Sequence, residues 1–162
     1  MKPNRNVAGF TLIELVTTVT LLGILLAIAV PSFRQLTLNQ GVKSAAFDLF
    51  SALQYTRSEA IKRPGQTITL VPVSGSDWTT GWKLLVGSGT VLRTWNVASN
   101  LSISVKDDGG TSLSSITFAR DGHVSSAPPT AEISPTVSVA GVFSRCVKVD
   151  LIGRPTSTLG GC

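Results

Sequence analysis

An apolar stretch near the N-terminus, residues 10–30, constrains this chain more than any other feature. It spans 21 residues and holds one acid, Glu14, and four threonines among otherwise apolar or small residues. As an α-helix it would be ~31 Å long, which is enough to cross the hydrocarbon core of a bilayer. Lys2 and Arg5 precede it without an acidic residue between them, and positive residues on this side keep an N-terminus in the cytoplasm. We therefore predict a single membrane pass, with the rest of the chain beyond the membrane.

Two general interpretations of this stretch are a secretory signal peptide and a plain membrane anchor. Ala27-Ile28-Ala29 has the small-residue pattern of a signal-peptidase site. Both interpretations leave Glu14 unexplained, because an acid inside an apolar membrane segment costs about 2.5–3.5 kcal/mol of insertion free energy. Cleavage after Ala29 would also separate the apolar stretch from the helix that is expected to follow it.

A third interpretation rests on the residues Gly9-Phe10-Thr11-Leu12-Ile13-Glu14. They resemble the processing site of type IV prepilins and of type II secretion pseudopilins. The resemblance implies that prepilin peptidase cuts between Gly9 and Phe10 and that the new N-terminus, Phe10, is methylated. It also implies that Glu14 neutralises the N-terminal amine of a neighbouring subunit during assembly, since a buried charge is tolerated when it is paired.

The helix is expected to continue past the apolar stretch in amphipathic form. From Val42 to Ala60, apolar residues recur at spacings of three and four, as they do on one face of a helix. Arg63-Pro64-Gly65 then ends the pattern. Pro31 lacks a backbone N–H and Gly23 is a poor helix former, so we predict kinks at these two positions.

Residues 64–162 change character and are rich in glycine, serine, threonine and valine. Trp78, Trp82 and Trp95 are predicted to lie in a core rather than to stack on a ligand. Short β-like runs alternate with turn signals, which predicts strands at 67–73, 82–86, 91–97, 101–105, 115–118, 136–139 and 145–152. The chain thus divides into a leader (1–9), a transmembrane and filament-core helix (10–30), an amphipathic half-helix (31–63) and a β-rich head (64–162).

Composition argues against catalysis and against a metal site. One histidine and nine acidic residues leave little material for acid–base or metal chemistry. Asp107-Asp108-Gly109-Gly110 lacks the alternating oxygen ligands of a calcium loop. The net charge of +5 lies mainly before the head, because residues 64–162 hold seven basic and six acidic residues. We expect no enzyme, no cofactor, no metal and no small-molecule substrate.

Six motifs, the first at the end of the expected helix and the others in the head, follow one another along the chain: Arg57-Ser58-Glu59-Ala60-Ile61, Trp78-Thr79-Thr80-Gly81-Trp82, Ile116-Thr117-Phe118, Asp121-Gly122, Arg145-Cys146-Val147-Lys148-Val149 and Gly153-Arg154-Pro155. In this order they resemble the GspH/FimT family of minor pilins. The resemblance implies an α+β type IV pilin fold, in which a long N-terminal α-helix packs on an antiparallel β-rich head. It implies other major and minor pilins as partners and a place at or near the pilus tip, where the subunit helps to prime assembly. Before assembly the protein would lie in the inner membrane with its head in the periplasm.

Cys146 and Cys162 are the two cysteines of the chain. A head exported to an oxidising periplasm favours their pairing. The loop that they close would add about 3 kcal/mol to the free energy of unfolding in the chain-entropy model. We therefore predict a disulfide that pins the C-terminal tail.

Two alternative functions stay open at this point. Some FimT-type pilins bind DNA through a C-terminal G-R-x-R pattern, of which this chain has Gly153-Arg154 but Thr156 in place of the last arginine. Arg154, Lys148 and Arg145 would then form a weak and salt-sensitive DNA-binding site. The other alternative is a GspH-type pseudopilin of type II secretion, because both machines use the same helical spine.

Overall fold

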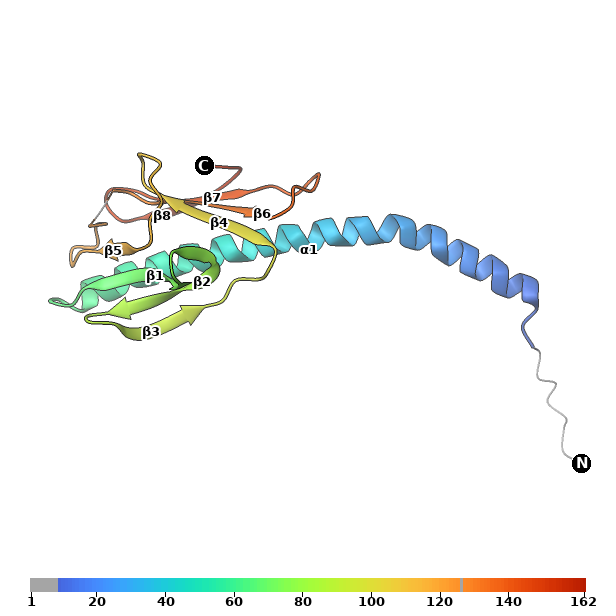
Figure 1. The fold of residues 1–162 in the computed structure, drawn as a ribbon, viewed down its shortest axis with the longest axis horizontal. Coiled ribbons are helices and arrows are strands. Elements are labelled where there is room, and N and C mark those ends of the chain that lie inside the picture. Colours follow the sequence, from blue (N-terminus) through green and yellow to red (C-terminus); the bar gives the residue numbers. More distant parts are fainter. Residues whose placement is uncertain (1–8, 126) are drawn as a thin grey trace, which may run out of the picture.

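The computed structural model describes residues 9–125 and 127–162, so most of the predicted leader, including Lys2 and Arg5, lies outside the described residues. Within that part, one long helix carries a head built from two antiparallel four-stranded sheets (Figure 1). This arrangement confirms the α+β class that the sequence predicts. The helix is long and apolar enough to cross a membrane.

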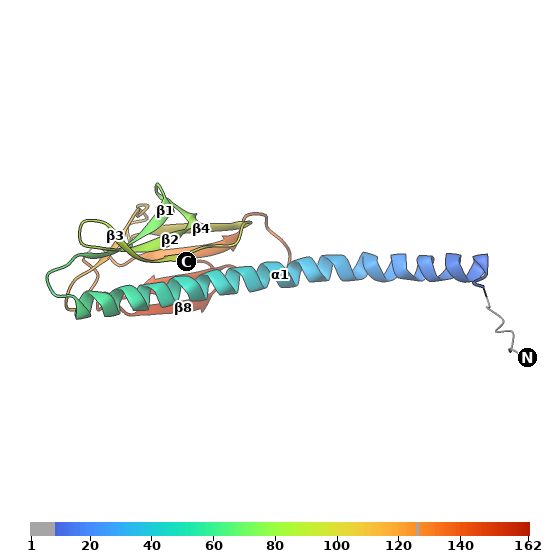
Figure 2. The same cartoon turned by 90° about the horizontal axis from the view of Figure 1, so that it is seen from below.

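Helix α1 (Leu12–Lys62) runs without a break for 51 residues. Thr11 caps its N-terminus, and at its C-terminus the Arg63 N–H donates to the Glu59 carbonyl at 3.1 Å. Pro31 lies inside the helix, and neither Pro31 nor Gly23 interrupts it. Figure 1 shows the N-terminal part of the helix curving away from the head, whereas Figure 2 shows it nearly straight in the perpendicular view.

The two halves of α1 lie in different surroundings. Large apolar side chains in residues 10–30 are between 50% and 86% exposed, and the head covers none of them. From Val42 onward, one face of the same helix is buried against the sheets. The buried residues follow the three- and four-residue spacing, and they are Val42, Ala45, Ala46, Leu49, Ala52, Leu53, Thr56, Glu59 and Ala60.

The first sheet has the strand order β3-β2-β1-β5 and is antiparallel throughout. Its strands are β1 (Ile68–Ser74), β2 (Asp77–Val86), β3 (Thr90–Trp95) and β5 (Ile116–Phe118). Gly81 has a φ of 96°, and a Cβ at this position would overlap the carbonyl oxygen of Trp95. Only glycine therefore fits where β2 passes the end of β3.

The second sheet has the order β4-β6-β7-β8. Its strands are β4 (Leu101–Lys106), β6 (Thr130–Pro135), β7 (Arg145–Val149) and β8 (Pro155–Leu159). Alternation directs the buried side chains of β4, β6 and β7 toward α1 and the core, and leaves serines, threonines and charged residues on the outer face. The helix contacts β6, β7 and β8 of this sheet, and β1 and β5 of the other.

The core lies where the two sheets and α1 meet. Trp78, Trp82 and Trp95 are 2%, 0% and 8% exposed, which confirms their predicted place in the core. The indole N–H of Trp78 donates to the carbonyl of Leu113 at 2.7 Å, so this buried donor is satisfied.

Two predicted strands were wrong. The strand predicted at 136–139 is instead β6 (Thr130–Pro135), because Ala131 and Ile133 face the core whereas Val137 is 63% exposed. The strand predicted at 145–152 ends at Val149, where the chain turns back and the Gly153 N–H donates to the Asp150 carbonyl. The next strand, β8 (Pro155–Leu159), was not predicted.

Candidate functional site

The Gly9–Phe10 bond lies just outside the helix, in an open segment. Phe10 is 86% exposed, and no heavy atom lies within 4 Å of the position that a Cβ on Gly9 would occupy. The next residue, Thr11, has extended backbone angles and begins the helix. A peptidase that binds extended backbone therefore meets no folded obstacle at this bond.

Glu14 and Thr11 hold each other in a capping box at the start of α1. The Glu14 carboxylate accepts hydrogen bonds from the Thr11 backbone N–H at 3.0 Å and from the Thr11 hydroxyl at 2.9 Å. In return, the Glu14 N–H donates to the Thr11 hydroxyl oxygen at 3.3 Å. The carboxylate thus lies at the positive end of the helix dipole, bonded to Thr11, the residue that follows the predicted mature N-terminus at Phe10.

The other polar groups of the apolar half are satisfied within the helix itself. The hydroxyl groups of Thr17, Thr18 and Thr20 donate to backbone carbonyl oxygens three or four residues earlier, at 2.8–3.0 Å. A hydroxyl bonded in this way adds little cost in an apolar medium. Glu14 is therefore the one charged group that this half of the helix carries into lipid or into a filament core.

Two amide side chains tie the base of the head to α1. The Gln35 amide donates to the Ala140 carbonyl and the Asn39 amide to the Gly141 carbonyl, both at 2.9 Å. The Asn39 amide oxygen also accepts from the Phe143 N–H at 3.3 Å. Gly141 has a φ of 77°, and a Cβ there would overlap the Gln35 side chain. No pattern in the sequence predicts this attachment.

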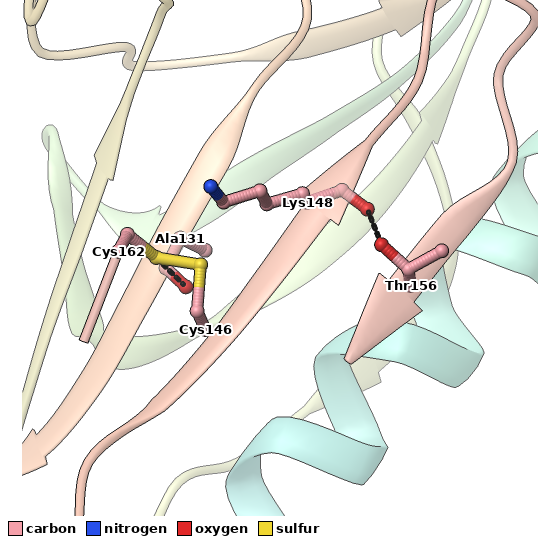
Figure 3. Close-up of a disulfide and its surroundings, with 5 residues drawn as sticks. All are labelled: Ala131, Cys146, Lys148, Thr156 and Cys162. Atoms are coloured by element: carbon pink, nitrogen blue, oxygen red, sulfur yellow. Dashed lines mark hydrogen bonds between the residues drawn. A yellow bond between two sulfur atoms is a disulfide. The ribbon is translucent and has the colours of Figure 1, made fainter. Parts of the chain in front are cut away.

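A disulfide joins Cys146 on β7 to Cys162 at the end of the described chain (Figure 3). It spans 16 positions in sequence, with the two Cα atoms 5.1 Å apart. The Cys162 sulfur lies 3.3 Å from the Ala131 carbonyl oxygen on β6. This is a packing contact, because a sulfur in a disulfide has no proton to donate. The tail is therefore fixed across the outer face of the second sheet.

The three cations considered for DNA binding are not brought together. Lys148 lies on the outer face of β7, on the side of the disulfide (Figure 3). Arg145 belongs to the opposite set of β7 side chains and lines a groove beside Lys43 of α1. Arg154 lies in the β7–β8 turn, where its Nε is 3.0 Å from Asp150.

The Asp150 carboxylate accepts two hydrogen bonds from Arg154, one from its backbone N–H and one from its guanidinium. The Arg154 backbone N–H donates to Asp150 at 2.7 Å. This bond, together with the guanidinium, holds the pKa of Asp150 below its usual value. The ion pair offsets one of the three candidate cations, and the remaining two face opposite sides of the sheet. Within residues 9–125 and 127–162 no group of three or more histidine, cysteine or acidic side chains is placed to hold a metal ion.

Two family models match the chain. Residues 45–153 match the family model described as type II transport protein GspH, and residues 4–30 match the prokaryotic N-terminal methylation motif. A search of curated protein sequences gives no significant match.

Two kinds of solved structure share the fold. The type IV minor pilin FimU of Pseudomonas aeruginosa aligns with a TM-score of 0.58 and 24% identity, over 72% of this chain and 91% of that chain. The minor pseudopilin EpsH from the type II secretion system of Vibrio cholerae aligns with a TM-score of 0.53 and 17% identity, over 76% and 95% of the two chains.

Proposed function

Because the chain belongs to the GspH family of pilins and pseudopilins, we propose that it is a minor pilin, inserted at or near the tip of a type IV pilus to help prime its assembly. The family consists of structural subunits rather than enzymes. One observation carries the proposal. The apolar N-terminal half of α1, which the head does not cover, continues directly into a half that packs one face against the folded head. A subunit of this form is held by lipid before assembly and by the helices of its neighbours afterwards.

Processing is the first step of the proposed pathway. The precursor lies in the inner membrane with its N-terminus in the cytoplasm and its head in the periplasm. Prepilin peptidase removes the leader at the open Gly9–Phe10 bond, and Phe10 is methylated. The motif match over residues 4–30 supports this step.

Docking is the second step. The Glu14 carboxylate pairs with the cationic N-terminal amine of a neighbouring pilin as the subunit leaves the membrane. Its position supports this role, because among the described residues the hydrogen bonds to this carboxylate come from Thr11, at the N-terminal end of the helix. The amine then replaces the Thr11 hydroxyl as a partner and neutralises a charge that would otherwise be buried alone.

A localisation experiment tests the proposal. The chain, produced at native level with an epitope at its C-terminus, should appear in sheared pili and be labelled at one filament end by immunogold. Deleting the gene should lower the number of pili and leave the length of those that form unchanged. A chain that stays in the cell envelope, with normal pilus numbers after deletion, contradicts the proposal.

A second candidate is a pseudopilin of a type II secretion system, which the family description favours. The two candidates differ in what the deletion removes: pili in one case, and secretion of folded exoproteins in the other. DNA binding is a third candidate and depends on Arg154. A titration of the full chain in detergent at two salt concentrations, with Arg154→Ala for comparison, tests it, because phosphate contacts weaken with salt.

A further inference from the structure

Strand β8 (Pro155–Leu159) forms an open edge of the second sheet, since it pairs with β7 alone. The Gly160 N–H donates to the Ser144 carbonyl, and the Asp150 N–H donates to the Arg154 carbonyl. Antiparallel ladders alternate between bonded and non-bonded pairs. The residues of β8 that bond to β7 are therefore Thr156 and Thr158, and the N–H and C=O groups of Ser157 and Leu159 point outward.

Natural edge strands are blunted by charged residues, by proline or by being very short. Pro155 blocks pairing only at the first position of β8, and the residues after it carry none of these devices. The outer strands β3 and β4 carry Arg93 and Lys106, and β5 has only three residues. No residue from Pro155 to Cys162 is charged, and the four residues after Pro155 are exposed.

A groove of about 560 Å³ lies beside this edge, between β8 and α1. Its walls include Phe47, which is 68% exposed, together with Phe50 on the helix and Ser157 on the strand. A smaller hollow of about 260 Å³ shares part of this lining and is bordered by Leu36, Phe143 and Leu159. The small Ser157 side chain leaves the flank of the helix uncovered at the point where the sheet ends.

The groove carries two cations and no acid among its described lining residues. Arg145 and Lys43 line both hollows. Arg145 is only partly exposed, and no side chain or carbonyl within residues 9–125 and 127–162 accepts a hydrogen bond from its guanidinium. A carboxylate that entered the groove would satisfy these donors through charge-assisted bonds.

We infer that β8 accepts an extended segment of a different subunit of the same filament as a fifth strand of this sheet. The inference rests on the proposed function. The outward N–H and C=O groups select extended backbone, Phe47 selects apolar side chains on alternate residues, and Arg145 with Lys43 selects a carboxylate. A second copy of this chain fits less well, because pairing β8 with β8 about a twofold axis would bring two cationic grooves together.

The test removes one outward N–H without touching the sheet's own bonds. In the full chain, Ser157→Pro removes a backbone N–H that does not bond to β7, and proline is tolerated in an edge strand where the N–H faces solvent. Ser157→Ala is the matched control, because it keeps this N–H. Each is combined with p-benzoylphenylalanine in place of the exposed Phe47 and expressed, as the only copy, with all other filament subunits. The same photocrosslinker at Val91 on β3, which is 51% exposed, controls for chance contact.

We expect Ser157→Ala and the unchanged chain to form, from position 47, an adduct with another subunit of the filament. Ser157→Pro should reduce this adduct by about tenfold or more with an unchanged melting temperature. Lys43→Glu, at an exposed helical position, should reduce it to a similar extent by repelling the carboxylate. Val91 should give no adduct that depends on residue 157.

Each other result overturns the inference or part of it. An equal adduct in Ser157→Pro contradicts strand pairing, and an adduct with a second copy of this chain contradicts the chosen partner. If Ser157→Pro lowers the melting temperature, its adduct yield no longer reports on strand pairing alone, and Lys43→Glu becomes the test. An undiminished adduct in Lys43→Glu contradicts the proposed docking mode. Sheared filaments from the same cells separate the two proposals. A chain present in filaments without an adduct at position 47 refutes this inference alone, whereas a chain absent from filaments refutes the proposed function.

Discussion

The two halves of α1 have opposite relations to the rest of the molecule. Residues 12–30 carry large apolar side chains around the helix, and nothing in the described part of the chain covers them. From Val42 onward only one face is apolar, and that face is buried. The pattern of apolar residues therefore distinguishes two kinds of partner. A one-sided stripe finds its partner within the same chain, and an all-round apolar segment needs lipid or other helices.

The largest expected effect concerns the end of the uncovered half. Replacing Gly9 with valine should block cleavage, because the cleaved bond of the processing site that this segment resembles follows a glycine. An immunoblot of membranes should show only full-length precursor. Gly23→Ala, a glycine replacement inside the helix, is the control and should be processed normally. Protein of mature size from the Gly9 variant would contradict the predicted site.

A matched pair of leucines compares the two halves directly. Leu53 is 1% exposed and Leu22 is 55% exposed. Leu53→Ala should lower the free energy of unfolding of the head by about 2–5 kcal/mol, through lost burial and a residual cavity. Leu22→Ala should leave it unchanged within about 0.5 kcal/mol. Denaturant unfolding of the full chain in detergent, followed by tryptophan fluorescence, measures both, and equal losses would mean that the halves are not independent.

The disulfide should stabilise only the head. Cys146→Ala combined with Cys162→Ala should lower the free energy of unfolding by about 3 kcal/mol. Without the disulfide the unfolded chain is no longer closed into a loop, so its conformational entropy rises. Membrane insertion and processing should be unaffected. Thermal melts with and without a reducing agent check this: reduction should lower the melting temperature of the unchanged chain and leave that of the variant where it was.

A smaller effect is expected from the buried carboxylate at the end of α1. Glu59 is 6% exposed, and its Oε2 lies 2.7 Å from the Nε of Arg63. This bond, assisted by Lys62, holds the pKa of Glu59 below its usual 4.5. The contribution of this pair to the free energy of unfolding is therefore present above pH 4.5, the pKa of a free glutamate. It is lost as the pH falls through the lower pKa of the folded state.

The measurement is the melting temperature of the full chain as a function of pH. It should decline below about pH 4.5, and Glu59→Gln should decline less steeply, because an amide does not titrate. Parallel curves for the two proteins would show that the Glu59–Arg63 pair makes no pH-dependent contribution.

Much of the helix could be predicted from the sequence, because spacing and composition act locally. The end of α1 at Lys62 follows from the Arg63-Pro64-Gly65 breaker. Strand β8 could not be found in this way, since Thr156, Ser157 and Thr158 show no apolar alternation and are held by pairing with β7. The false strand at 136–139 has alternating valines, yet Val137 is 63% exposed, and the residues that follow, Ala140 and Gly141, are bonded to α1 through Gln35 and Asn39.

The candidate site divides in the same way. A local sequence motif predicts the Gly9–Phe10 bond as the processing site. The same motif contains the pattern of a capping box, a threonine followed three residues later by a glutamate. The capping box of Thr11 and Glu14 could therefore have been predicted from the sequence, but it was not. The separation of Arg145 from Lys148 depends on strand alternation, and the pairing of Arg154 with Asp150 depends on a turn. The first could be read from the predicted strand at 145–152, whereas the second was hidden because that strand was predicted to run past Val149, through the turn.

The docking role of Glu14 is tested most directly by how much Glu14→Ala, expressed as the only copy in the cell, is incorporated into pili. The variant should be inserted and processed normally, and its head should melt at the same temperature, yet it should be nearly absent from sheared pili. Glu14→Asp, which keeps the charge, should restore part of the incorporation. If Glu14→Ala enters pili as well as the unchanged chain and supports normal piliation, the uncovered half of α1 does not dock through this carboxylate and the central claim fails.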